Sequence, residues 1–137
     1  MASPLQSLIA TGTKLWLDSI DPDLVRANRA LGATGATSNP AIIADLIKTG
    51  RFDERIEAVI AEGLNDNDLA WRLTDELVRD AQAVFRPVWE ETAGNDGYVS
   101  FELEPLLEDP ACTQSHAARV ENYIDLGRRL SRGHQNR

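Results

Sequence analysis

The sequence predicts an α/β fold, in which a helix-rich chain of 137 residues surrounds a parallel sheet of about three strands. Short apolar segments at residues 14–18, 32–37 and 98–103 alternate with longer segments of helical periodicity. Strands that alternate with helices favour a parallel sheet, because a parallel connection needs a crossover that a helix supplies. The apolar fraction of 42% and the charged fraction of 26% are those of a single globular domain.

Three such strands fit either a doubly wound domain or part of a TIM (β/α)₈ barrel. A complete barrel takes about 250 residues. A chain of 137 residues therefore corresponds to roughly half of one. An open three-stranded sheet is a further possibility, although its edge strands would be exposed to association.

The first strand is brief and leads directly into a helix. Residues 14–18 are apolar and are followed by an Asp-Pro dipeptide, which is typical of the end of a buried strand. Pro22 suits the first turn of a helix that continues to about residue 31.

The second strand is built from small residues at 32–37. Pro40 fits the first helical position of the helix that follows, at residues 41–49, and either Asn39 or Ser38 would cap it. The chain therefore begins with two consecutive βα units.

The remaining helices are predicted from apolar residues that recur at three- and four-residue steps, at residues 52–63, 66–92 and 113–132. Pro87 should kink the longest of them or start a new turn. A glycine-rich turn precedes the third strand at 98–103, and the polar residues 132–137 are predicted as a loop into another strand.

The net charge of −8 excludes some classes of partner. Affinity for nucleic acid or an anionic membrane depends mainly on Lys and Arg, which are outnumbered here, 14 to 22, by acidic residues. One local arginine fork can nevertheless hold a small phosphorylated substrate on an acidic protein. Because the sequence shows neither a signal peptide nor the roughly 20 apolar residues of a membrane span, a cytoplasmic protein is expected.

A metal site is not predicted. Cys112 is the only cysteine, which excludes an internal disulfide and a cysteine-only metal cluster. His116 and His134 have no third ligand at metal-binding spacing.

Polar side chains lie at the ends of the predicted strands. Asp18, residues 37–39 and Glu102 all fall at carboxyl-terminal ends of parallel strands, where α/β folds collect reacting groups. Alternation along the first strand places Lys14, Trp16 and Asp18 on one face. Two carboxylates and an amide in a confined site can be pushed to different pKa values and divide proton-transfer roles.

Each of these residues also has a purely structural interpretation. Asp18 could cap the next helix, and the Ser-Asn-Pro sequence at 38–40 is a good helix start. Glu102 is harder to explain in this way, because it lies between Phe101 and Leu103 in a strand expected to be buried. A buried carboxylate is costly unless it is paired or used.

Four segments stand out by their order and spacing: Leu-Asp-Ser at 17–19, Ala-Thr-Ser-Asn-Pro at 36–40, Tyr-Val-Ser-Phe-Glu-Leu-Glu-Pro at 98–105, and Tyr-x-x-x-Gly-x-x-Leu at 123–130. Together they resemble the first three βα units of a transaldolase, and the resemblance covers nearly the whole chain. It implies part of a (β/α)₈ barrel enzyme, a transferase of the pentose phosphate pathway. Such enzymes move a dihydroxyacetone unit between sugar phosphates through a lysine Schiff base, without a metal or organic cofactor.

The resemblance also implies roles for four residues. Asp18 would act on the substrate hydroxyl proton during C–C cleavage, and Glu102 would transfer protons through a water during carbinolamine formation and breakdown. Asn39 would hold the dihydroxyacetone hydroxyls, and Thr37 would orient the relay water. An imine mechanism needs such acids and bases close to the nucleophile.

The imine-forming lysine of the family belongs to strand four, beyond residue 137. Lys14 and Lys48 are the only lysines. Lys14 lies four residues before Asp18, about 13 Å away at roughly 3.3 Å per residue, and Lys48 falls in a helix. The chain is therefore expected to be the N-terminal part of a transaldolase, truncated before strand four and inactive by itself.

Two alternatives belong to other functional classes: a non-catalytic sugar-phosphate binder, and an interaction module that self-associates. The expected small-molecule partner is a sugar phosphate, and either the missing C-terminal half or self-association is expected to cover the open sheet. The apolar face left exposed is expected around Trp16, Val99 and Phe101.

Overall fold

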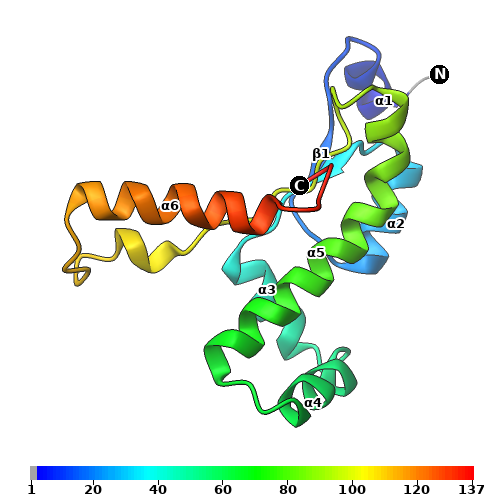
Figure 1. Cartoon of the computed structure of the whole chain (residues 1–137). Helices are drawn as coiled ribbons and strands as arrows, with labels where there is room; N and C mark the ends of the chain where they lie inside the picture. Colours follow the sequence, from blue (N-terminus) through cyan, green and yellow to red (C-terminus); the bar gives the residue numbers. More distant parts are fainter. Residues whose placement is uncertain (1–2) are drawn as a thin grey trace.

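The computed structural model describes residues 3–137, which form a small parallel sheet and a larger number of helices (Figure 1). In chain order the elements are α1 (Pro4–Ile9), β1 (Trp16–Leu17), α2 (Pro22–Ala30), β2 (Gly35–Ala36), α3 (Pro40–Lys48), α4 (Asp53–Ala61), α5 (Asp66–Glu91), the 3₁₀ helix η1 (Pro105–Glu108) and α6 (His116–Ser131). The helix-rich α/β class predicted from the sequence is confirmed. No helix among residues 3–137 is long and apolar enough to cross a membrane.

The sheet is smaller than predicted. β1 and β2 pair in parallel with Trp16 opposite Gly35 and Leu17 opposite Ala36. The predicted third strand at 98–103 is reduced to a single parallel bridge between Ala36 and Val99. The described residues therefore form two short strands and one bridge, and the prediction of a full third strand was wrong.

The third strand stops early because its neighbour leaves the sheet. The backbone N–H of Ser100 donates to the carbonyl of Ala36 at 3.0 Å, and β2 ends at Ala36. The chain then turns away to begin α3 at Pro40. Residues 101–103 consequently continue in irregular conformation, without a ladder of their own among the described residues.

The helices after the first two strands begin where the prolines predicted. Asp21 caps α2, because its Oδ1 accepts from the backbone N–H of Asp23 at 2.8 Å. Asn39 caps α3 by accepting from the N–H of Ile42 at 2.9 Å. The cap of α2 is thus Asp21 and not Asp18, which removes the structural interpretation considered for Asp18.

Helix α5 supplies more of the buried apolar side chains than any other element among the described residues. It runs without a break from Asp66 to Glu91, with Pro87 inside it, so no new helix begins at that proline. It packs against α2 and α4. Its fully or almost fully buried apolar side chains are Leu73, Leu77, Val78, Ala81, Phe85 and Val88.

The polar tail at 132–137 is a loop, as predicted, and it is docked against the rest of the chain. Asn136 is only 3% exposed, and its Nδ2 donates to the carbonyls of Gln82 and Gly97 at 3.0 Å each. Its own carbonyl accepts from the N–H of Val99 at 3.0 Å. The tail thus occupies the side of Val99 opposite Ala36, where a further parallel strand would pair.

The docked tail covers part of the sheet that was expected to be exposed. Val99 is fully buried, and the guanidinium of Arg137 lies 4.7 Å from the ring centre of Phe101, which is itself half-buried. Trp16 is 39% exposed, as the open sheet predicted. The expectation of exposure was therefore correct for Trp16 and wrong for Val99.

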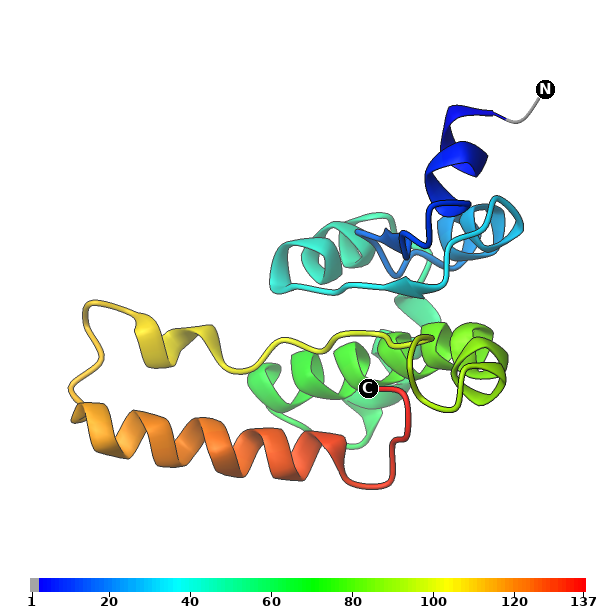
Figure 2. The ribbon, with the colours of Figure 1, turned by 90° about the horizontal axis from the view of Figure 1, so that it is seen from above.

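Helix α6 and the segment before it extend away from the rest of the molecule (Figure 1). Seen from above, α6 runs alongside the segment that contains η1 and leads from the sheet to the first residue of α6 (Figure 2). None of its 16 residues is buried. An amphipathic helix normally buries its apolar side, so α6 is the least covered of the long elements.

Candidate active site at the strand ends

The two strands end side by side, and their last polar residues are bonded to each other. The backbone N–H of Thr37 donates to the carbonyl of Leu17 at 2.8 Å, which extends the parallel ladder by one step. The Thr37 hydroxyl then donates to Oδ1 of Asp18 at 2.8 Å. The structure therefore brings together Asp18 and Thr37, both of which were selected from the sequence.

The predicted alternation along the first strand is confirmed. Leu15 and Leu17 pack against the hydrophobic core, whereas Lys14, Trp16 and Asp18 are exposed on the other face. Asp18 therefore lies on the uncovered face of the sheet, open to solvent and to a ligand.

A tryptophan and a glycine shape this face below Asp18. The indole N–H of Trp16 donates to Asp96 at 3.0 Å, and the ring lies over Gly35. A Cβ at position 35 would lie 2.9 Å from Nε1 of Trp16 and 2.6 Å from the carbonyl of Tyr98. Only glycine lets the backbones of the three segments approach this closely.

A serine pair, which the sequence reasoning did not select, joins the second strand end to the third segment. Ser38 is 4% exposed, and its Oγ donates to the carbonyl of Ser100 at 2.8 Å. Its N–H donates to the Ser100 hydroxyl at 3.2 Å. Ser38 had been considered as a helix cap and as part of the strand end at 37–39, but its contact with Ser100 was not predicted. The available signal was a small hydroxyl residue in each of the two segments.

Asn39 and Glu102 lie around a separate cavity. Both line a cavity of about 310 Å³ between α3, α5 and the segment leading into η1, together with apolar side chains such as Ile43 and Trp71. Asp18 and Thr37 are not among the residues that line it. The four predicted residues therefore form two pairs, which residues 37–39 connect along the chain.

The environments of Asn39 and Glu102 differ from the expectation. Oδ1 of Asn39 is occupied by the cap of α3, so the structural interpretation of this residue is confirmed for that atom. Glu102 is exposed and lies outside any strand, so the expectation of a buried carboxylate was wrong. The regular pairing ends at Ser100, and the side chain of Glu102 is left in contact with water.

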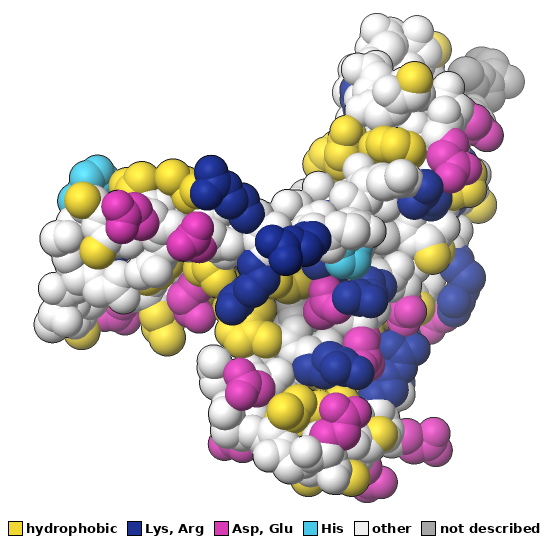
Figure 3. Space-filling view, viewed as in Figure 1, with side chains coloured by type: hydrophobic (Ala, Val, Ile, Leu, Met, Phe, Trp, Pro, Cys, Tyr) yellow, Lys and Arg dark blue, Asp and Glu magenta, His cyan; other side chains and the backbone are white. Residues whose placement is uncertain are grey.

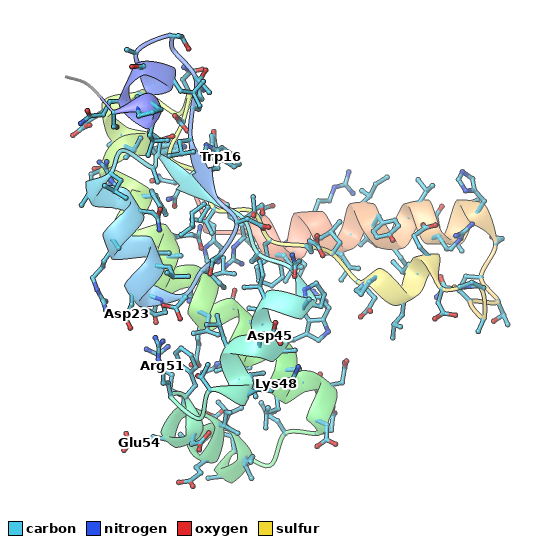
Figure 4. All side chains as sticks on the ribbon, turned by 180° about the vertical axis from the view of Figure 1, so that it is seen from behind. Trp16, Asp23, Asp45, Lys48, Arg51 and Glu54 are labelled. Carbon is cyan, nitrogen blue, oxygen red and sulfur yellow. The ribbon has the colours of Figure 1, made fainter. Side chains whose placement is uncertain are left out.

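The acid that caps α2 has a shifted pKa. Burial alone would raise the pKa of Asp21, but the N–H groups of Leu24 and Asp23 and the guanidinium of Arg51 outweigh it, so the pKa lies below its usual value. Arg51 bonds Asp21 at 2.9 Å. It also pairs with Asp23 at 3.3 Å, and these two residues lie close together in Figure 4. This ionic contact fixes the start of α2, three residues after Asp18.

Neither lysine lies among these groups. The ammonium of Lys14 donates to the backbone carbonyl of Asn95, on the side from which β1 enters the sheet. Lys48 is the last residue of α3 and pairs with Asp45 at 3.0 Å on the exposed surface (Figure 4). The described site thus carries acids, hydroxyls and an amide, and neither of the two lysines.

The fold and these groups define a class of protein: a parallel βα protein with polar side chains at the carboxyl ends of its strands. A family model described as transaldolase/fructose-6-phosphate aldolase matches residues 15–131. The chain belongs to this family, as its sequence motifs predicted.

Individual relatives agree with the family match. The chain is 31% identical over 133 residues to the transaldolase of Kocuria rhizophila, an alignment that covers 91% of this chain and 36% of that protein. It is 34% identical over 125 residues to the transaldolase of Trichodesmium erythraeum, covering 85% and 32% respectively. The chain spans about a third of the length of the curated relatives it matches.

Proposed function

We propose that the chain supplies the first βα units of a transaldolase barrel, which transfers a dihydroxyacetone unit between sugar phosphates through a lysine Schiff base. The observation that supports this most directly is the 2.8 Å hydrogen bond between Thr37 and Asp18. It joins two polar groups at the ends of neighbouring parallel strands, within the region that matches the family model.

In this proposal Asp18 is the group that takes and returns the substrate hydroxyl proton during C–C bond cleavage. Its carboxylate is exposed on the open face of the sheet, and one oxygen is held by Thr37. A base positioned by a neighbouring hydroxyl is suited to transfer a proton at a defined atom. Thr37 acts as the positioning group and orients the water of the proton relay.

Asn39 and Glu102 have complementary roles. The cap contact fixes the Asn39 amide, which leaves Nδ2 as the donor for the hydroxyl oxygens of dihydroxyacetone. Glu102 lines the same cavity and is open to water. A water-accessible carboxylate can move protons when the carbinolamine forms and loses water.

The lysine nucleophile is supplied, in this proposal, by a strand that pairs beyond Val99. The N–H of Val99 already points away from Ala36 and bonds the carbonyl of Asn136. A strand continuing from this position would bring its carboxyl end to the same edge as Asp18 and Thr37. The 137-residue polypeptide would therefore provide proton transfer and positioning but no covalent step.

A chimera tests this assignment. Residues 15–131 of this chain would replace the matching segment of the Kocuria rhizophila transaldolase, and transaldolase turnover would be measured. The chimera should be active. Asp18→Asn and Glu102→Gln should each lower kcat by about 10²–10⁴-fold with little change in KM.

Two exposed acids that do not line the cavity provide matched controls. Asp45→Asn on α3 and Glu54→Gln on α4 remove the same charges and should leave turnover near that of the unmodified chimera (Figure 4). A folded chimera without activity would contradict the proposal, and so would near-normal turnover in both site variants.

A further inference from the structure

A second polar groove lies between α5, α6 and the C-terminal tail. It has a volume of about 830 Å³ and shares none of the residues Asp18, Thr37, Asn39 or Glu102. The arginines that line it, called here the arginine groove, are Arg72, Arg79, Arg129, Arg132 and Arg137. Figure 3 shows Lys and Arg side chains gathered where α6 joins the rest of the molecule.

This concentration of cations contrasts with the net charge of −8. The carboxylates that line the same groove are Asp68, Asp75 and Glu104. Asp75 pairs with both Arg79, at 2.6 Å, and Arg137, at 2.8 Å. The other two carboxylates accept from the side chain of Asn65 and the backbone N–H of Leu106, so each lining acid is already engaged.

Two of the arginines have unused donors. Neither Arg129 nor Arg132 forms an ion pair or a side-chain hydrogen bond with any residue in 3–137, and both are exposed. The pKa of His134 in the same groove is lowered, first by burial and then by the charges of Arg137 and Arg79. The groove is therefore a region of positive potential on an acidic protein.

The most buried arginine points to a ligand. The side chain of Arg137 is 4% exposed, and its terminal nitrogens bond Asp75, Gln82 and the carbonyl of Leu130. Its Nε is buried without a hydrogen-bond partner. A buried N–H without a partner is uncommon in proteins, and it calls for an acceptor that the described residues do not provide.

We propose that the arginine groove binds a small multivalent phosphate, either a phosphate monoester or a free phosphate or pyrophosphate. Guanidinium groups match the geometry of phosphate oxygens and bind them with paired hydrogen bonds. Arg129 and Arg132 supply the free donors, and Arg137 supplies the buried one. The inference does not depend on the proposed function, because none of Asp18, Thr37, Asn39 and Glu102 lines the arginine groove.

Isothermal titration calorimetry of the 137-residue chain with pyrophosphate, in about 0.1 M NaCl, tests the proposal. Saturable binding is expected. The double variant Arg129→Gln, Arg132→Gln should weaken it by at least about tenfold. Both side chains are exposed, and circular dichroism would check that the fold is retained. The matched control Arg26→Gln, Arg29→Gln on α2 removes the same charge outside the groove.

Each outcome decides the matter. The absence of saturable binding to the unmodified chain would overturn the proposal, as would equal weakening in the two double variants, because the effect would then be diffuse electrostatics. Titration with glycerol 1-phosphate and with inorganic phosphate distinguishes a phosphate monoester from a free phosphate anion as the ligand. Tighter binding of the monoester identifies a phosphorylated metabolite, and tighter binding of the free anion identifies inorganic phosphate.

Discussion

The hydroxyl of Thr37 and the carboxylate of Asp18 are joined by a 2.8 Å hydrogen bond that crosses from the end of one parallel strand to the end of its neighbour. The bond holds one carboxylate oxygen and leaves the other free on an exposed face. In the proposed mechanism the Thr37 hydroxyl orients Asp18 as the base. This contribution does not require a nucleophile from the same strand ends.

The first prediction concerns this bond. In the chimera with the Kocuria rhizophila enzyme, Thr37→Val keeps the shape of the side chain but removes its donor. The turnover number should fall by about tenfold or more, because a hydrogen bond to a charged group contributes about 1.5–3 kcal/mol. Thr37→Ser, which retains the hydroxyl, should recover most of the rate. Equal rates for the valine and serine variants would show that the bond has no part in turnover.

The second prediction is that the 137-residue polypeptide forms no Schiff base. Lys14 is held by the carbonyl of Asn95, and Lys48 pairs with Asp45 on the surface, so neither lies at the strand ends. Borohydride reduction in the presence of fructose 6-phosphate should leave the intact mass unchanged. The Kocuria rhizophila transaldolase serves as the positive control. A stoichiometric adduct mapped to either lysine would refute this expectation.

The third prediction concerns the docked tail. Asn136→Ala removes the side-chain contacts to Gln82 and Gly97 and leaves their buried carbonyls without these donors. The free energy of unfolding should fall by about 1–3 kcal/mol, as measured by urea denaturation. Asn67→Ala, an exposed control, should change it by less than about 0.5 kcal/mol. A loss no larger than that of the control would mean that the tail contributes nothing to stability.

The predictions from the sequence were correct where a residue determines the conformation of the chain in its immediate neighbourhood. Pro22 and Pro40 begin helices, and Asn39 caps the second of them. These outcomes follow from fixed proline geometry and from one side-chain acceptor, and neither needs a distant partner. The proximity of Asp18 and Thr37 was also predicted, from the position of both residues at strand ends in a parallel sheet.

The failures involve contacts between distant segments. The strand at 98–103 was predicted from its apolar residues, but its ladder depends on whether β2 remains alongside. The buried environment of Asn136 depends on Gln82 and Gly97, which are 54 and 39 residues away. A polar tail gives no local sign that it will be buried, because its hydrogen bonds come from other elements.

The fourth prediction concerns pH. The pKa of Asp21 is below its usual value of 3.8. As the pH falls, the unfolded chain therefore takes up a proton at this carboxylate at a higher pH than the folded chain does. Its ionic stabilisation is complete at neutral pH and is lost as the pH falls below about 4 and through the folded pKa. Asp21→Asn can still cap α2 but has no charge to pair with Arg51.

Urea unfolding at several pH values measures this effect. The stability of the unmodified chain should decline more steeply between about pH 5 and pH 2 than that of Asp21→Asn. Asp45→Asn on α3, whose ion pair is largely exposed to solvent, should retain the steep decline. Parallel pH profiles for the unmodified chain and Asp21→Asn would show that the Arg51 contact does not stabilise the fold.

The fifth prediction is that the 137-residue chain associates with itself. Helix α6 buries none of its residues, and Val120 and Ile124 are 42% and 47% exposed on it. Trp16 adds an exposed aromatic ring on the open face of the sheet. Apolar side chains left in water favour association, since burial contributes about 25 cal/mol for each Å² removed from solvent. Size-exclusion chromatography with light scattering should give a mass above that of one chain.

Substitutions on α6 identify the surface responsible. Val120→Glu with Ile124→Glu places two charges on its apolar side and should shift the chain toward the monomer. Leu31→Glu is the control, because Leu31 is 59% exposed at the end of α2, away from α6. If both variants behaved alike, α6 would not be the contact surface. A monodisperse, cooperatively unfolding monomer of the unmodified chain that binds no hydrophobic dye would show that the open sheet and the uncovered helix are stable in water without a partner.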